Sequence, residues 1–464
     1  MKRGTVVGLG ACCVAFAIGC GGGGGIPAGS ERGPCYPNGG CDLGLTCASD
    51  LCVRVETDAG GRGGGGAGAS GGGGGGSGTG GATGAAGTSA VAPHAAQPQI
   101  ANLGGPVLNA PKLLPIFFAG DPNRLEVEQF LEGVGTGSYW RATTSEYGVG
   151  PITVLPAVTL AAAPSGSISD NTLQVELANN TASASAPWGA ADPNTIYLFA
   201  ISPSMTLTFS TEACCTTFGG YHIETTVNGV AVPYIAACSC PGLTGPGANI
   251  VDERTAAISH ELIEAATDPF PLSDPAYTGA NQSNVVWTLV TGGELTDMCV
   301  IQSDAYGYLA GSGWAVSKSW SNAAAARGDD PCVPAATSIP YFNSVPVLDL
   351  IPVDYTGTYE TRGLAIPIGA SRTIDVDLFS TGVVPHDWDV NVYSYEDYFG
   401  GTRSLNLSLD RTSGRNGDVL RLTITPLRTN PVLGVNPFIV LSTYGSPGQV
   451  DFRSHVAMGL VITQ

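Results

Sequence analysis

The stretch ISHELIEAATDP, residues 258–269, determines how the central part of the chain folds. Small or apolar residues fill most of the positions around its histidine and two glutamates, and a helix that is apolar on nearly every side belongs in a protein core. Proline cannot continue a helix, so the pair Asp268 and Pro269 ends this one. The sequence therefore predicts a buried helix from about Asp252 to Thr267.

This helix carries the residue types of a metal site. His260 and Glu264 are four positions apart and project from one face of a helix, close enough to reach a single ion. Glu261 lies where the HExxH helix of zinc peptidases has the carboxylate that takes a proton from a metal-bound water. Glu264 replaces the second histidine, and a carboxylate oxygen is an accepted zinc ligand. We therefore expect His260 and Glu264 to bind Zn²⁺, or another divalent metal, and Glu261 to act as general base.

A third ligand must come from elsewhere in the chain. The segment TGGELTDMC, residues 291–299, offers Glu294 and Asp297. We favour Asp297 slightly, because Cys299 close by could anchor it through a disulfide to Cys332. His222, in the segment GGYHIE, is the other candidate.

The ordinary alternative is a helix without a metal. A single HExxE sequence is usually a solvated face of histidine and glutamate. Here the surrounding residues predict burial, and burying two carboxylates and an imidazole costs free energy unless a cation or hydrogen-bond partners compensate. Burial therefore favours metal binding.

The segments before and after this helix predict an α+β domain at residues 97–335. Continuous apolar runs predict strands, and a Pro-containing start with a glycine stop predicts a short helix at residues 121–134. The pair Asn228 and Gly229 is a strong hairpin signal between β-rich arms. Cysteines 214, 215, 238 and 240 flank this hairpin and can pair across it. The expected strands cover residues 112–120, 150–160, 194–202 and 221–238.

The composition changes after Pro334. Apolar and polar residues alternate strictly in several runs, and turn residues separate these runs. This pattern predicts an antiparallel β-sandwich domain at residues 336–464. Three of the alternating runs are Ile374–Leu378, Leu405–Leu409 and Leu420–Ile424.

The N-terminal region predicts export. Lys2 and Arg3 precede an apolar run too short to span a bilayer, which indicates a signal peptide at residues 1–20. The sequence AIGC, ending at Cys20, resembles a bacterial lipobox, so we expect an outer-membrane or cell-surface lipoprotein, with plain secretion as the alternative. Four cysteines at positions 35, 41, 47 and 52 predict a disulfide module at residues 21–53. Residues 54–96, rich in Gly, Ala and Ser, predict a flexible linker.

The charge of the chain excludes one class of partner. Asp and Glu total 38 and Lys and Arg total 19, so the net charge is −19. Such a chain repels phosphate backbones, and no basic stripe counteracts this, so we expect no nucleic-acid partner. The expected partners are a peptide or protein substrate and a membrane reached only through a lipid on Cys20.

Several segments together resemble a known group of proteins. SHELIEAATDP, GGELTDMC, WAVSKSWSNAAAA and GGYH are similar to motifs of the secreted EXORDIUM-like (phosphate-induced) proteins and their bacterial zincin-like relatives. The likeness covers about residues 105–335. It implies a zincin-like fold, with His260 and Glu264 as metal ligands, Glu261 as catalytic base and a ligand-bearing element at Glu294 to Asp297.

Two functions follow as hypotheses. The first is a surface-anchored metallopeptidase in which the substrate lies along an edge strand and Glu261 transfers the proton. The second is a non-catalytic protein on a zincin-like scaffold that binds glycan or another cell-wall component through the C-terminal domain. Its stacking surface would use the aromatic residues Trp388, Tyr393, Tyr395, Tyr398 and Phe399.

Overall fold

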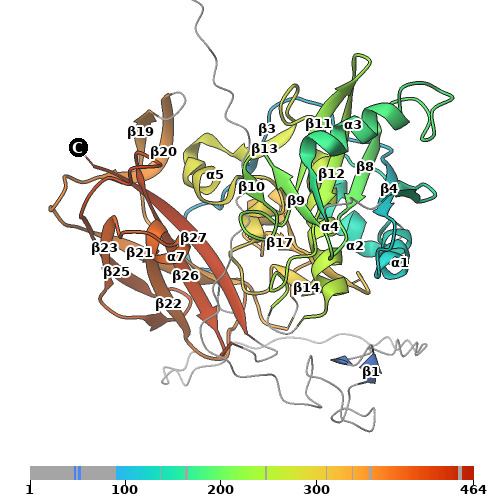
Figure 1. Ribbon diagram of the computed structural model, residues 1–464. Coiled ribbons are helices and arrows are strands. Elements are labelled where there is room, and N and C mark those ends of the chain that lie inside the picture. The colour runs from blue at the N-terminus through green and yellow to red at the C-terminus, as the bar shows by residue number, and fades with distance from the viewer. Residues whose placement is uncertain are drawn as a thin grey trace, which may run out of the picture. The chain divides into compact units, whose positions relative to one another are not determined.

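The computed structural model describes residues 46–48, 51–53, 90–135, 137–161, 166–245, 248–309, 311–336, 338–354, 358–447 and 452–463. A six-stranded sheet organises the first half of the chain, with strand order β11-β12-β8-β4-β5 and with β6 also pairing with β4 (Figure 1). Only β11 and β12 run antiparallel, and the other pairs are parallel. The strands are β4 (Lys112–Phe118), β5 (Thr153–Val154), β6 (Val158–Leu160), β8 (Thr195–Ala200), β11 (Gly220–Val227) and β12 (Val230–Ala237).

The central strands are buried on both faces, which explains their continuous apolar sequences. In β8, Ile196 and Leu198 enter one hydrophobic core, and Tyr197 and Phe199 enter the other. Helix α3 (Asp170–Asn180) contributes Leu173 and Leu177 to the second core. The sheet therefore has a separate core on each face.

The predicted helix is α4 (Ile250–Thr267), and it packs on the first core. It begins two residues before the predicted start, because the Asn249 side chain accepts hydrogen bonds from the N–H groups of Val251 and Asp252. Every residue from Asp252 to Thr267 is buried. The helix contacts β8, β11 and β12 of the sheet, and also β15 (Ala315–Ser317), α1 (Arg124–Val134) and α2 (Ser138–Thr144).

Several sequence predictions for this half are confirmed. They include strand β4, helix α1 and the hairpin of β11 and β12, in which Asn228 and Gly229 have φ angles of 50° and 83°. Positive φ at both positions is what a two-residue hairpin turn needs. The segment 150–160 forms two short strands instead of one, and α3 was not predicted. Its apolar residues do not form a clear helical stripe, but Ser169 caps it by accepting a hydrogen bond from the N–H of Thr172.

Short elements follow α4 and connect it to the second half of the chain. The predicted disulfide between Cys299 and Cys332 is present and joins η3 to β17. These elements are β13 (Tyr277–Ala280), η2 (Gln282–Asn284), α5 (Val285–Thr291), η3 (Asp297–Cys299), β14 (Tyr306–Tyr308), β16 (Ser319–Trp320), α6 (Asn322–Arg327) and β17 (Cys332–Val333). Smaller elements before α4 are β3 (Ile100–Asn102), η1 (Ser145–Tyr147), β7 (Ser167–Ser169), β9 (Thr206–Phe209) and β10 (Glu212–Ala213).

The second half is a β-sandwich, drawn in orange and red in Figure 1. One sheet has the order β18-β21-β25-β23 and the other β19-β20-β27-β26-β22-β24, and both contribute to a third core. The prediction of a purely antiparallel sandwich is wrong in one place, because β20 and β27 pair in parallel. The strands are β18 (Phe342–Pro346), β19 (Asp349–Asp354), β20 (Thr358–Ala365), β21 (Arg372–Ser380), β22 (Trp388–Ser394), β23 (Leu405–Leu409), β24 (Ser413–Gly414), β25 (Val419–Pro426), β26 (Asn436–Tyr444) and β27 (Arg453–Ile462), and α7 (Tyr395–Phe399) is the one helix in the described residues of the sandwich.

The sandwich shares a core with the first half. Val456, Met458 and Leu460 of β27 belong to the same buried cluster as Trp287 and Val290 of α5. Residues 90–446 and 452–463 of the described chain accordingly form a single compact unit. The boundary expected at residue 335 therefore separates two layers that are packed together.

Little of the N-terminal region is described. Strands β1 (Thr46–Ala48) and β2 (Leu51–Val53) pair with Cys47 opposite Cys52. The signal peptide, the lipobox at Cys20 and Cys35 and Cys41 lie outside the described residues. The last part of the expected linker, residues 90–96, contacts the sandwich, where the ring of His94 stacks 3.5 Å from that of Phe379. No helix of the described chain is both long and apolar enough to cross a membrane.

A buried ion pair holds α4 to the segment before α1. Arg254 donates to both carboxylate oxygens of Asp121 at 2.8 and 2.7 Å, and both side chains are almost completely buried. We expect Asp121→Ala to lower the free energy of unfolding by about 3–5 kcal/mol, because it leaves a buried guanidinium unpaired. Urea denaturation measures this change.

The matched control is Asp349→Ala, which breaks the exposed pair of Asp349 with Arg372. An exposed pair contributes at most about 1 kcal/mol. Equal losses of stability in the two variants would contradict a structural role for the buried pair.

Candidate metal centre

Helix α4 presents His260 and Glu264 on one face. His260 Nε2 lies 3.4 Å from Glu264 Oε1, and both side chains are buried. Asp297, at the start of η3, reaches the same place, with Oδ1 3.3 Å from His260 Nε2. One ligand atom from each of the three residues fits within 4.8 Å of the others. Ligand atoms about 2.0–2.2 Å from a tetrahedral zinc ion lie about 3.3–3.6 Å apart, so the separations measured from His260 match a zinc site.

Other residues hold these three side chains in place. The Tyr306 hydroxyl lies 3.2 Å from His260 Nδ1, and the Ser317 hydroxyl lies 3.5 Å from the same atom. Glu264 Oε1 accepts hydrogen bonds from the hydroxyl and the backbone N–H of Thr296. Tyr306 and Ser317 contact the ring nitrogen of His260 that lies away from Glu264, whereas Thr296 bonds the Glu264 oxygen that faces His260. Polar partners of this kind fix the orientation of a ligand. Here they leave His260 Nε2 facing Glu264 and Asp297.

His222, on strand β11, forms a second group behind the first. Its Nδ1 lies 3.6 Å from Glu264 Oε2 and 3.8 Å from Glu261 Oε2, and its Nε2 lies 3.8 Å from Glu294 Oε1. Both carboxylates named as possible third ligands therefore reach the cluster, but only Asp297 lies beside His260. Glu294 lies beside His222. Since the His222 separations are longer than those around His260, we take His260, Glu264 and Asp297 as the stronger ligand set.

Several atoms of this cluster are buried and have no hydrogen-bond partner. They are both ring nitrogens of His222, Glu261 Oε2 and Glu264 Oε2. Buried polar atoms in proteins are nearly always hydrogen-bonded, and buried charges are paired or coordinate metals. The donor set of imidazole and carboxylate, with these atoms unsatisfied, fits a divalent cation such as Zn²⁺.

The electrostatics of the cluster follow from its crowding. Burial alone would lower the pKa of His260, but Glu264 and Asp297 outweigh burial and raise it to about 10. Burial, reinforced by the charge of Glu264, raises the pKa of Asp297 to about 7. Burial also opposes the charge of Glu264, but His260 and His222 outweigh it and lower the pKa of Glu264 to about 2. Without a cation, the protein therefore holds a proton on His260 at neutral pH.

A cleft of about 460 Å³ opens onto this centre, and its lining includes His260, Glu261, Asp297 and Tyr306. Gly220, the first residue of β11, also lines the cleft. A Cβ atom on Gly220 would lie 2.8 Å from Glu261 Oε1, so a larger residue there would have to displace this carboxylate. Glu261 is therefore accessible from the cleft and lies close to Gly220.

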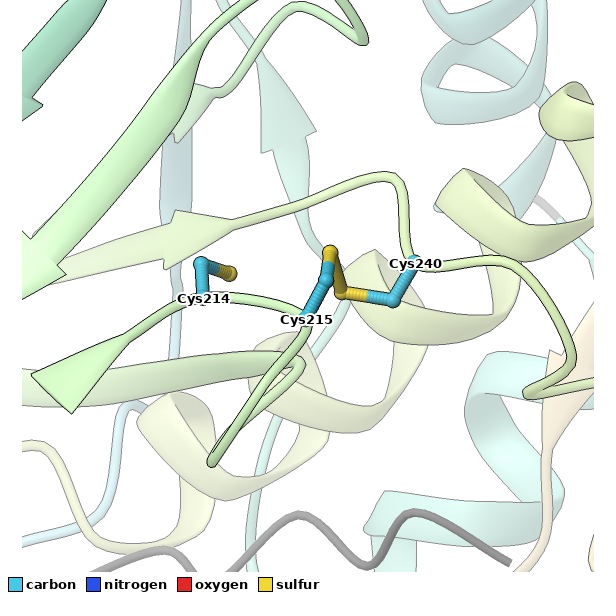
Figure 2. A group of neighbouring side chains, drawn as sticks. All are labelled: Cys214, Cys215 and Cys240. Carbon is cyan, nitrogen blue, oxygen red and sulfur yellow. A yellow bond between two sulfur atoms is a disulfide. The ribbon is translucent and has the colours of Figure 1, made fainter. Parts of the chain in front are cut away.

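Three cysteines near the cleft are close enough to suggest a second metal site, but they are oxidised. Figure 2 shows Cys214 next to the disulfide between Cys215 and Cys240. Cys214 itself is bonded to Cys238. The prediction that these cysteines pair across the hairpin is confirmed, and a disulfide sulfur is not a thiolate ligand.

The aromatic residues expected to form a sugar-stacking surface do not share one exposed face. Trp388 is buried, and its ring N–H donates to the Ser344 hydroxyl. Tyr393, Tyr395, Tyr398 and Phe399 are half-buried against the core that the two halves share. Tyr398 and Phe399 line the cleft.

Comparison with known proteins does not assign a family. No known family profile matches the chain, and no curated protein sequence matches it. Among solved structures, domains 4 and 5 of the S-layer protein SbsC are 17% identical over 25% of this chain and 54% of that chain, with a TM-score of 0.15. Domains 4–9 of the same protein are 15% identical over 32% of this chain and 25% of that chain, also at 0.15. The match spans about half of the first structure, and a TM-score this low does not establish a shared fold. The resemblance to EXORDIUM-like and zincin-like proteins stays a prediction.

The ligand set makes a prediction about metal content. We expect the purified protein to hold about one zinc ion per chain, because Glu264 and Asp297 both lie at a tetrahedral separation from His260 Nε2. His260→Ala should lose the metal, and the control His386→Ala, which changes an exposed histidine of the sandwich, should keep it. Elemental analysis of dialysed protein measures the content. If His260→Ala kept the metal and His222→Ala lost it, the metal ligands would be His222 and the carboxylates around it, and His260 would not be a ligand.

Metal affinity should also depend on pH. A cation can bind His260 and Asp297 only after both lose their protons, and their pKa values of about 10 and about 7 mean that binding releases protons near neutrality. We expect Zn²⁺ affinity to rise by about tenfold or more per pH unit from about pH 6 to pH 9. Calorimetric titration in buffers of different ionisation enthalpy counts the released protons. An affinity that does not change with pH would exclude His260 as a ligand.

Proposed function

We propose that the protein is a metal-dependent peptidase. The observation that carries this proposal is the placement of Glu264 and Asp297 at 3.4 and 3.3 Å from His260 Nε2, beneath an open cleft whose lining also includes Glu261. A zinc ion bound there would polarise a peptide carbonyl and lower the pKa of a water molecule toward neutrality. The proposal includes a zincin-like fold, and the mixed sheet with α4 packed on it is compatible with that fold.

The position of Glu261 and the direction of its pKa shift suit a general base. Burial raises the pKa of its carboxyl, although His222 and His260 act in the opposite direction. A general base works best when its pKa lies near the operating pH, so a raised value favours proton transfer. His222 Nδ1, 3.8 Å from Glu261 Oε2, restricts the carboxylate from behind, and Gly220 leaves the space that it needs.

Strand β11 offers a place for an extended peptide. It is the edge strand of the six-stranded sheet, and in the described chain only β12 is hydrogen-bonded to it as a strand. An edge strand can hold a peptide through main-chain hydrogen bonds. Because Gly220 at the start of β11 lines the cleft, a peptide paired there would pass close to Glu261.

The disulfides support an extracellular role within this proposal. Three disulfides occur in the described chain, Cys214–Cys238, Cys215–Cys240 and Cys299–Cys332. Disulfides persist in oxidising compartments and are rare in the cytosol. We propose that the protein is exported and attached to a surface through a lipid on Cys20, or is secreted. Tyr398 and Phe399, two of the aromatic residues named for the glycan-binding alternative, also line the cleft, but the candidate metal ligands beside them favour the peptidase.

The proposal predicts a specific loss of activity. Glu261→Gln should reduce metal-dependent peptide hydrolysis by about 10²–10⁴-fold, because the amide cannot accept the proton. The control is Glu132→Gln, which changes an exposed glutamate of α1 and should keep wild-type activity. Hydrolysis of a peptide library, followed by mass spectrometry, measures the effect. A wild-type protein that holds its metal but hydrolyses no member of the peptide library would count against a peptidase.

A further inference from the structure

The lining of the cleft comes from both halves of the chain. The first half contributes the metal centre and two loops, at residues 215–220 and 240–245. The disulfide between Cys215 and Cys240 ties these loops together. The sandwich contributes Tyr398 and Phe399 of α7, Leu441 and Thr443 of β26, and Phe452 and Ser454 at the start of β27. The cleft is therefore incomplete without the C-terminal sandwich.

Hydrogen bonds fix the sandwich against the segment that carries a metal ligand. The Tyr398 hydroxyl donates to the backbone oxygen of Ile301 at 3.4 Å, and the N–H of Ser303 donates to the Ser454 hydroxyl at 2.7 Å. Ile301 and Ser303 lie between Asp297, a candidate ligand, and Tyr306, which contacts His260. The sandwich lining is thus held at a defined place relative to the metal centre.

Asp304, which is half-buried, pairs with a buried lysine of the first half and lies near an arginine of the sandwich. Lys318 Nζ lies 2.8 Å from Asp304 Oδ2, and Arg453 Nε of β27 lies 3.8 Å from the same oxygen. Asp304 belongs to the same segment as Ser303, and Arg453 directly follows Phe452. The charges that join the two halves therefore lie next to residues of the lining.

The chemistry of the lining favours an apolar ligand. Tyr398, Phe399 and Phe452 are half-buried, and the rings of Tyr398 and Phe399 pack edge to face with centroids 5.0 Å apart. The charged or titratable lining groups are His260, Glu261, Asp297 and the tyrosines, and the lining contains no Lys or Arg. Outside the metal centre, the lining has no cationic side chain that could pair with a carboxylate of the ligand, and Glu261 and Asp297 would repel one. An aromatic side chain gains from both apolar burial and ring packing.

We propose that Tyr398, Phe399 and Phe452 of the sandwich recognise an aromatic or large aliphatic side chain of a peptide bound in the cleft. This proposal adds a substrate preference to the proposed peptidase. It rests on that function only for the position of the scissile bond, which would lie next to the recognised side chain. The volume of about 460 Å³ lies within the usual range for a ligand site and exceeds that of one side chain. The cleft therefore also has room for the adjoining main chain.

Peptide binding tests the recognition site independently of hydrolysis. The probes are short labelled peptides that differ only at one central residue, which is Phe, Leu, Ala or Glu. Binding is measured by fluorescence anisotropy in the full chain carrying Glu261→Gln, so that bound peptides persist. We expect the Phe peptide to bind at least about tenfold more tightly than the Ala peptide, and the Glu peptide to bind most weakly.

Two variants and one control assign this preference to the sandwich. Phe399→Ala and Phe452→Ala should each reduce the ratio of Phe to Ala affinity by about tenfold. Leu427→Ala removes a half-exposed apolar side chain of the sandwich outside the cleft and should leave the ratio unchanged. Circular dichroism and metal content establish whether each variant is folded. Because Phe399 and Phe452 are changed separately, the test stays valid if one of the two variants does not fold.

The outcomes separate the two proposals. If Phe399→Ala and Phe452→Ala lower the preference for the Phe peptide and the wild-type protein hydrolyses no peptide, the recognition site is supported and the peptidase is rejected. If the wild-type protein hydrolyses peptides and both folded variants keep the wild-type ratio of Phe to Ala affinity, the recognition site is overturned and the peptidase remains. Binding of soluble cell-wall oligosaccharides in place of the peptides also overturns it.

Discussion

The structure depends on one electrostatic constraint, which is the burial of three glutamates and two imidazoles around a helix in the core, with the half-buried Asp297 beside them. Glu261, Glu264, Glu294 and Asp297 face His222 and His260 at separations of 3.3–3.8 Å. Such a cluster is stable only with protons or cations between its members. The same constraint explains why several of its atoms lack hydrogen-bond partners, and it connects the fold of α4 directly to the chemistry of the cleft.

Local sequence predicted the elements whose signals are local. Helix α4 has a proline stop, the β11–β12 hairpin has Asn228 and Gly229, and the sandwich strands have strict alternation, so these elements were predicted within a few residues. Helix α3 was missed because its buried residues, Leu173 and Leu177, are few and another apolar residue, Val175, is exposed on a different face. The parallel pairing of β20 with β27 depends on residues about a hundred positions apart and has no local signal.

The candidate site was predictable only in part for the same reason. His260, Glu261 and Glu264 share one helical turn, so their spacing alone places them together. Sequence left Asp297, Glu294 and His222 as alternatives, and only tertiary packing separates the residue beside His260 from those behind it. Tyr306 and the lining from the sandwich carry no motif. A tyrosine or phenylalanine in a β-rich segment predicts core packing as well as it predicts a binding site.

Because both halves of the chain line the cleft, the ribosome makes the two parts of its lining at different times. A ribosome adds residues from the N-terminus, so His260, Glu264 and Asp297 exist in the growing polypeptide long before Phe452 and Ser454 are added. A nascent chain that already carries these residues still lacks the last part of the lining until β27 has been made and has packed against α5. The order of translation thus keeps the complete cleft from forming until the residues of β27 have been added.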